Sequence, residues 1–173
     1  SGKGLPAALY MAKVQALIRF AAKVFRTPKD IIIEVNKQIF GKFERHSFVT
    51  VSLGLFNTKK QILRFIRAGH NPAIFARNGS VELLNTSGIG LGLDRDYLFS
   101  KHLDEHEIKL ESNSLVLFYT DGLNEAMNKN KEEFGMERLI NIIKQNKHLS
   151  PADINKKLES EVKSFVKDAE QRD

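Results

Sequence analysis

The stretch LFYTDGLNEA, residues 117–126, decides how the rest of the chain is interpreted. An apolar run with aromatic and β-branched character ends abruptly at Thr120-Asp121-Gly122. Asp-Gly is a common turn, and aspartate also caps helices. A carboxylate at the end of a buried strand can equally be a rigidly mounted ligand for Mg²⁺ or Mn²⁺, which prefer oxygen donors. The residues alone leave both interpretations open, and the turn is the simpler one.

Strand patterns dominate the residues that precede this stretch. Residues 47–57 and 62–69 alternate and predict a hairpin. Residues 71–84 predict a second hairpin around Asn78-Gly79, which is the best short-range turn signal in the chain. Residues 97–110 and 114–120 are expected to add further strands. The middle of the chain is therefore predicted to form antiparallel sheets.

Helical patterns flank this middle region on both sides. Residues 5–25 carry two apolar stripes, so we expect a helix that is buried on most of its circumference. A second helix begins at Thr27-Pro28 and runs to about Phe40, and residues 136–145 and 152–167 form two more. Helices at both ends of an antiparallel middle predict an α+β fold, with one domain over residues 1–173 and helices packed on the sheet faces.

Composition narrows the class of protein. The 173 residues are 42% hydrophobic and 28% charged, which is typical of a soluble globular domain. The absence of cysteine excludes disulfides and thiolate metal sites, and agrees with a cytoplasmic location. The net charge is +6, but the lysines are dispersed and do not alternate with aromatic residues, so we expect no nucleic-acid partner. Any membrane anchor is expected in segments outside this chain.

Four short motifs have ordinary structural explanations. SGKG at residues 1–4 lacks the ending of a Walker A loop, and its glycines are expected to allow close backbone approach at a helix N-terminus. GIGLGL at residues 88–93 is a loop, because no helix follows it. HLDEH at residues 102–106 fits a metalloprotease pattern that requires a helix, whereas its flanks alternate as strands. Taken singly, His70 is a turn residue and Asp173 a charged tail residue.

Taken together and in order, several stretches carry a family likeness over essentially the whole chain. The sequence resembles the SpoIIE/RsbU-type serine phosphatases, the bacterial branch of the metal-dependent PPM (type 2C-like) protein phosphatases. GHNPA and YTDGLNEA, correctly ordered and spaced, are specific together. The stretches that match are SGKGLPAALYMA (1–12), NKQIF (36–40), FVTVSLGLFN (48–57), RAGHNPAIF (67–75), GIGLGL (88–93), LFYTDGLNEA (117–126), FGMERL (134–139) and QRD (171–173).

The resemblance implies a β-sandwich flanked by helices, in αββα layers, with two Mn²⁺ or Mg²⁺ ions at one end. In such a site the metals deprotonate a bridging water, which attacks a phosphoserine or phosphothreonine in line. Asp121 aligns with a metal-binding aspartate, with Gly122 beside it, and Asp173 aligns with the first aspartate of the family's closing Asp-Asp-x-Thr element. The substrate or switch region would consist of Ser1, Gly2, Lys3 and Gly4.

The resemblance leaves the general acid open. Ser1 stands where eukaryotic relatives carry a histidine proposed for that role. His70 is a catalytic candidate, and protonation of the leaving group by metal-bound water is equally possible.

The chain also departs from the family pattern at both ends. An aspartate that bridges both metals precedes SGKG in the family, and the closing element continues beyond Asp173. We therefore expect a domain incomplete at both termini, with poor metal binding, little or no phosphatase activity, and sheet edges open to pairing.

The implied partners belong to bacterial signalling. The expected substrate is a phosphorylated STAS-type anti-sigma-factor antagonist in a partner-switching pathway of sigma-factor regulation and stress response. An upstream sensor domain would move the first two helices as a regulatory switch, and a homodimer is possible. The alternative is a non-catalytic interaction module, with the same fold but no working metal centre.

Overall fold

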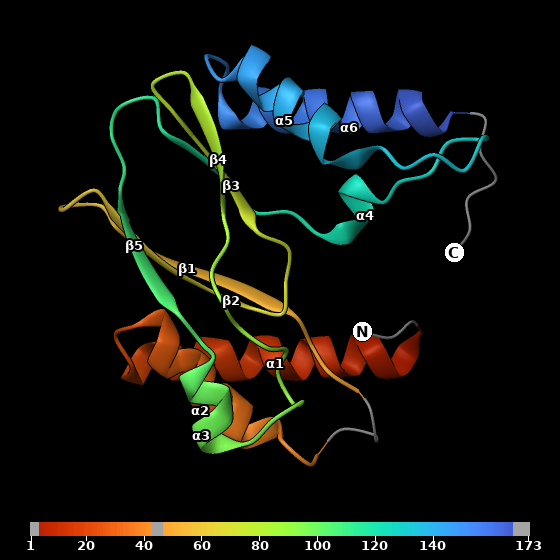
Figure 1. Ribbon diagram of the computed structural model, residues 1–173. Coiled ribbons are helices and arrows are strands. Elements are labelled where there is room, and N and C mark those ends of the chain that lie inside the picture. The colour runs from red at the N-terminus through yellow and green to blue at the C-terminus, as the bar shows by residue number, and fades with distance from the viewer. Residues whose placement is uncertain (1–3, 43–46, 168–173) are drawn as a thin grey trace. The chain divides into compact units, whose positions relative to one another are not determined.

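The computed structural model describes residues 4–42 and 47–167, which divide into two compact units (Figure 1). One unit comprises the residues up to Pro72 together with Asn85–Leu110, and the other comprises Ala73–Leu84 together with the residues from Glu111 onward. Each unit contains one antiparallel three-stranded sheet and helices of its own. The predicted α+β class is confirmed. The sandwich of the two sheets and the single domain over residues 1–173 stay predictions.

The first unit contains the first predicted hairpin. Its sheet has the order β1-β2-β5, and Val51 pairs with Ala68 and Asn57 with Ile62, as the alternation predicted. Helices α1 and α2 lie along one side of this sheet (Figure 1). The elements of this unit are α1 (Leu5–Val24), α2 (Pro28–Ile39), β1 (Val51–Asn57), β2 (Ile62–Ala68), α3 (Asp96–Lys101) and β5 (Glu105–Lys109).

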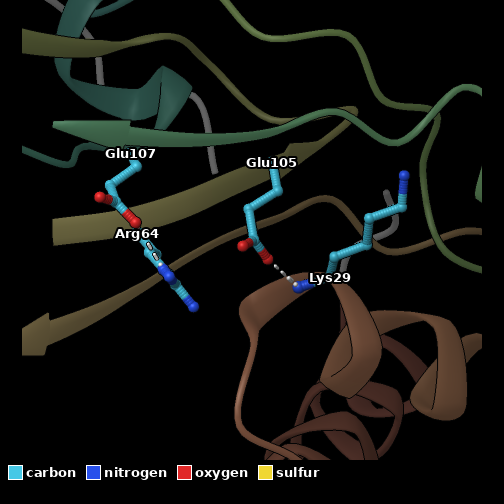
Figure 2. A network of polar contacts seen from close by, with 4 residues as sticks. All are labelled: Lys29, Arg64, Glu105 and Glu107. Atoms are coloured by element: carbon cyan, nitrogen blue, oxygen red, sulfur yellow. Dashed lines mark hydrogen bonds and ion pairs between the residues drawn. The ribbon is translucent and has the colours of Figure 1, made fainter.

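Helix α2 is fixed at its start and along one face. The Thr27 hydroxyl accepts a hydrogen bond from the backbone N–H of Asp30 at 3.1 Å, which caps the helix as predicted. The Glu105 carboxylate of β5 accepts from the backbone N–H of Lys29 at 3.0 Å, so a negative charge also faces this N-terminus (Figure 2). Along the helix, one face is fully buried in the core: Ile31, Ile32, Val35 and Ile39.

Beside Glu105, Arg64 and Glu107 form a cross-strand ion pair at 2.7 Å (Figure 2). The hydrogen bond and charge of Glu107 raise the pKa of Arg64 above its ordinary value. Both side chains stay nearly half exposed, so the pair contributes little to stability.

The prediction that the first helix is buried on most of its circumference is wrong. In α1 only Val14 and Ala21 are buried, on the face that joins the core with α2. The opposite face stays apolar but open to solvent, with Leu5 73% and Phe20 67% exposed. The periodicity located two apolar stripes correctly, but a second stripe is buried only where another element covers it.

Residues 97–110 are also not the single strand region that alternation predicted. Asp96–Lys101 forms α3, and only Glu105–Lys109 pairs with β2. Phe99, within α3, and Leu103, two residues beyond its end, are both buried in the core of the first unit. His102 follows α3 and His106 lies in β5, so the two histidines do not share a helix face. The metalloprotease pattern is thus not realised in this segment.

The second unit contains the second predicted hairpin and the C-terminal helices. Its sheet has the order β4-β3-β6. Arg77 pairs with Ser80 across Asn78 and Gly79, whose φ angles of 45° and 87° fit the expected two-residue turn. The strand predicted over residues 114–120 is shorter than expected. The elements of this unit are β3 (Ala73–Arg77), β4 (Ser80–Leu84), β6 (Leu115–Leu117), α4 (Asp121–Asn124), α5 (Gly135–Asn146) and α6 (Pro151–Val166).

Helices α5 and α6 confirm the predicted C-terminal helices and form the core of the second unit. They lie side by side, and α5 contacts β3 and β4 (Figure 1). Ser150 caps α6, because its hydroxyl accepts from the backbone N–H of Asp153 at 3.2 Å. The residues buried between these elements are Ile74, Ala76, Leu139, Ile142, Ile143, Ile154 and Leu158. No helix in the described part of the chain is long and apolar enough to cross a bilayer.

The GIGLGL segment is a loop, as predicted, and a buried amide holds it to α2. Asn36 is almost fully buried. Its side-chain oxygen accepts from the backbone N–H of Gly92 at 2.8 Å, and its side-chain NH₂ donates to the carbonyl of Asp94 at 2.9 Å. One side chain therefore satisfies two backbone groups of a long loop.

We predict that Asn36→Ala lowers the free energy of unfolding by about 2–3 kcal/mol, because it leaves the two loop groups without partners. Urea unfolding measures the effect. Gln38→Ala on the same helix is the control, since Gln38 is exposed and its side chain bonds to that of Glu34, and we expect a change within about 0.5 kcal/mol. Equal effects of the two substitutions would contradict the structural role of Asn36.

Candidate functional site

Asp121 begins a short helix rather than ending a strand. Strand β6 ends at Leu117, and Thr120, in an extended conformation, is the N-cap of α4. Asp121 is the first residue of this four-residue helix, and its side chain is exposed. The strand-end carboxylate that the sequence suggested is thus displaced by a short connection and mounted at a helix start.

The side chain of Asp121 makes few hydrogen bonds within the described residues. Its Oδ1 accepts a hydrogen bond from the backbone N–H of Gly122 at 2.9 Å. Its backbone carbonyl accepts from the N–H of Glu125 at 2.8 Å. Among the described residues, Oδ2 has no hydrogen-bond partner. The carboxylate therefore has lone pairs available to an external cation, and its position depends on the backbone around it.

Upstream of Asp121, a buried tyrosine fixes the backbone. Tyr119 is 8% exposed and packs in the core of the second unit. Burial raises the pKa of the Tyr119 phenol above its ordinary value, so its hydroxyl stays protonated. It donates to the Sδ of Met136 in α5 at 3.1 Å. The residue two positions before Asp121 is therefore attached to the first turn of α5.

Downstream, residues 126–134 form a closed loop. The backbone N–H of Phe134 donates to the carbonyl of Ala126 at 2.8 Å, and Met127 and Glu133 form an antiparallel bridge. Within the loop, the side-chain oxygen of Asn128 accepts from the N–H groups of Asn130 and Glu132. The chain that follows α4 thus leaves the core after Ala126 and returns to it at Phe134, and these two residues form the neck of the loop.

Arg138 holds this neck and was missed by the sequence reasoning. Its Nη1 donates to the carbonyls of Glu133 at 3.0 Å and Phe134 at 2.8 Å. The available signal was FGMERL at residues 134–139, which places an arginine one helical turn after a buried phenylalanine.

His70 lies in the first unit, in the turn after β2. Its Nδ1 is 3.0 Å from the hydroxyl of Thr50, and its carbonyl accepts from Nη1 of Arg67 at 2.8 Å. Arg67 also donates to the carbonyl of Thr86 at 2.9 Å. These contacts account for the position of His70 structurally, and its catalytic role stays a prediction.

Of the predicted substrate or switch region, Gly4 alone is described. It is the N-cap of α1 with φ 83° and ψ −165°, a conformation that only glycine adopts readily. Ser1, Gly2 and Lys3 lie outside the described residues, and so does Asp173. Asp121 and Gly122 are therefore the predicted metal-site residues that the structure places, and they adjoin each other on α4.

The donor chemistry of Asp121 fits a Mn²⁺ or Mg²⁺ ligand. It is an exposed carboxylate with an available oxygen, on a backbone anchored on both sides. In the described ranges no group of three or more histidine or acidic side chains could hold an ion. Asp121 can therefore supply one ligand of a metal site, and the site would need further ligands from other residues.

The chain is similar to a known protein family and to curated proteins. The family described as Stage II sporulation protein E (SpoIIE) matches residues 1–173. The phosphoserine phosphatase RsbU of Bacillus subtilis is 25% identical over 131 residues, covering 75% of this chain and 38% of RsbU. The chain spans well under half the length of the curated relatives it matches.

Solved structures share the fold. The SiaA-PP2C domain of Pseudomonas aeruginosa superimposes with a TM-score of 0.83 at 18% identity, covering 100% of this chain and 69% of that one. The PP2C phosphatase domain of SpoIIE from Bacillus subtilis, with a fragment of its regulatory domain, gives a TM-score of 0.74 at 18% identity, with coverage of 95% and 47%. At these identities the likeness establishes the fold alone.

We predict that Gly122, beside Asp121, and Gly135, at the start of α5, respond oppositely to alanine. At Gly122 a Cβ would lie 3.9 Å from the Thr120 hydroxyl, so Gly122→Ala should change the free energy of unfolding by less than about 1 kcal/mol, and in the stabilising direction. Gly135 has equal room but a φ of 81°, so Gly135→Ala should cost about 1–2 kcal/mol. Urea unfolding of both variants tests this, and a cost at Gly122 matching that at Gly135 would refute it.

Proposed function

This chain belongs to the SpoIIE family, and from that membership we propose that it is a phosphatase domain that removes phosphate from phosphoserine or phosphothreonine of a protein substrate. The observation that carries the proposal is the family match over residues 1–173, which includes the TDG element at Asp121. The relationship to RsbU, which is named a phosphoserine phosphatase, favours the same reaction class.

Asp121 is proposed as a ligand of Mn²⁺ or Mg²⁺, with Asp173 and the Gly122 backbone as further candidates. When bound, such ions supply a water nucleophile at neutral pH and neutralise phosphoryl charge. The chain's own contribution is to present the Asp121 carboxylate to solvent while Tyr119 and Phe134 stay buried on either side. A fixed ligand on a packed scaffold loses little conformational freedom when it binds an ion.

The substrate and partners are also proposals. A phosphorylated STAS-type anti-sigma-factor antagonist is the proposed substrate, and an upstream sensor domain the proposed source of regulation. Both rest on the resemblance to the RsbU-type phosphatases. A homodimer is a further proposal of the same kind.

We predict that Asp121→Asn lowers Mn²⁺-dependent phosphate release from a phosphoserine peptide by at least about a hundredfold, because a neutral amide replaces an anionic ligand. The assay is run on the protein as its gene encodes it. Asp153→Asn is the matched control, since Asp153 is an exposed aspartate in the first turn of another helix of the same unit. We expect Asp153→Asn to keep full activity.

Two results would count against this proposal. Undiminished activity in Asp121→Asn would remove Asp121 from the reaction. Absence of both Mn²⁺ binding and phosphate release in the unsubstituted protein would favour the non-catalytic interaction module instead.

A further inference from the structure

We propose that Arg138 is a positioning residue for Asp121: its guanidinium holds closed the neck of the loop (residues 126–134) that directly follows α4, the helix on which Asp121 lies. The inference rests on the proposed function in so far as Asp121 binds a metal. The contacts that carry it lie within the second unit.

The guanidinium joins three segments at one point. Nη1 donates to two successive carbonyls, those of Glu133 and Phe134, at the end of the loop. The guanidinium carbon lies 4.7 Å from the ring centroid of Phe165 in α6, where cation–π attraction favours it. The ring of Phe134 meets Phe165 edge-on at 5.4 Å. Arg138 thus ties the loop end to both α5 and α6.

From this point a short path of contacts leads to Asp121. Phe134 is 2% exposed, and its N–H donates to the carbonyl of Ala126 at 2.8 Å. Ala126 and Leu123 pack on the core of the second unit. The N–H of Glu125 donates to the carbonyl of Asp121. A shift of Phe134 would therefore pass through Ala126 to α4.

Helix α4 cannot hold this geometry by itself. It has four residues, which is too short for a helix that is stable without tertiary contacts. Its start is fixed through Tyr119, and its end depends on the neck at Ala126 and Phe134. A single guanidinium nitrogen of Arg138, Nη1, donates to the two carbonyls at that neck, and the planar group also lies over the ring of Phe165, a combination that suits arginine better than lysine.

A purely structural role for Arg138 makes a different prediction. In that case Arg138→Ala would lower the stability of the whole unit, and the Asp121 segment would change only in proportion. Arg77 provides a matched control. It also lies over an aromatic ring of the second unit, 5.6 Å from the centroid of Phe75, but on β3 and without a contact to the loop in the described chain.

The first measurement uses the metal-free protein. Amide hydrogen exchange is followed at Leu123 and Glu125, whose N–H groups are bonded within this turn. We expect exchange about tenfold faster in Arg138→Ala and within about twofold of wild type in Arg77→Ala. Arg138→Lys should give an intermediate increase, and it replaces the alanine variant if that variant does not fold.

The second set of measurements determines Mn²⁺ binding, the Mn²⁺ requirement of activity, and KM for the substrate. The Mn²⁺ concentration for half-maximal binding, measured by water-proton relaxation, should rise about tenfold in Arg138→Ala. The Mn²⁺ concentration for half-maximal activity should rise by about the same factor. KM for a phosphoserine peptide, measured at saturating Mn²⁺, should stay unchanged. Arg77→Ala should leave all three quantities unchanged.

Unchanged exchange at Leu123 and Glu125, or the same increase in Arg77→Ala, would overturn the proposal. Faster exchange with an unaltered Mn²⁺ requirement would overturn it as well. If the wild-type protein binds no Mn²⁺, the proposed function fails. The exchange measurement alone then decides whether Arg138 positions the backbone of Asp121.

Discussion

The geometry of the candidate site depends on the backbone that positions the exposed carboxylate of Asp121. Within the described part of the chain, the side chain of Asp121 accepts a single hydrogen bond, which comes from the backbone N–H of the next residue. Its position is therefore set by the backbone, which is fixed at buried Tyr119 on one side and at buried Phe134 on the other. Such an arrangement leaves the carboxylate available to a ligand while packed core residues set the position of its backbone.

In the first unit, polar side chains hold the long loop by bonding to its backbone groups. Asn36 satisfies two backbone groups of residues 92–94, and Arg67 binds the carbonyls of His70 and Thr86. Glu105 supplies an acceptor for the first turn of α2. Each of these polar side chains bonds to backbone groups, because backbone donors and acceptors removed from water must be paired, and Arg67 bonds in addition to the side-chain oxygen of Asn85. In both units, a few long polar side chains determine where irregular segments lie.

Features with strong local signals were predictable from the sequence. The Asn78-Gly79 turn, the two hairpins and the capped starts of α2 and α6 follow from residues adjacent in the chain. Alternation predicts a strand over residues 97–110, but Asp96–Lys101 forms α3, because a short apolar pattern fits either period and tertiary contacts decide between them. Asp121 was identified through the order of motifs, whereas Asp-Gly alone would have indicated a turn.

The sequence by itself determined the family, the α+β class and Asp121 as the residue to examine, since these depend on residue identity and order. It also located both apolar stripes of α1. The tertiary structure alone decided that one of those stripes stays exposed in the described chain, and that Arg138 meets the carbonyls of Glu133 and Phe134 beside Phe165. The physical reason is that periodicity shows which side chains share a face, but a contact exists only where the fold brings a second element to it.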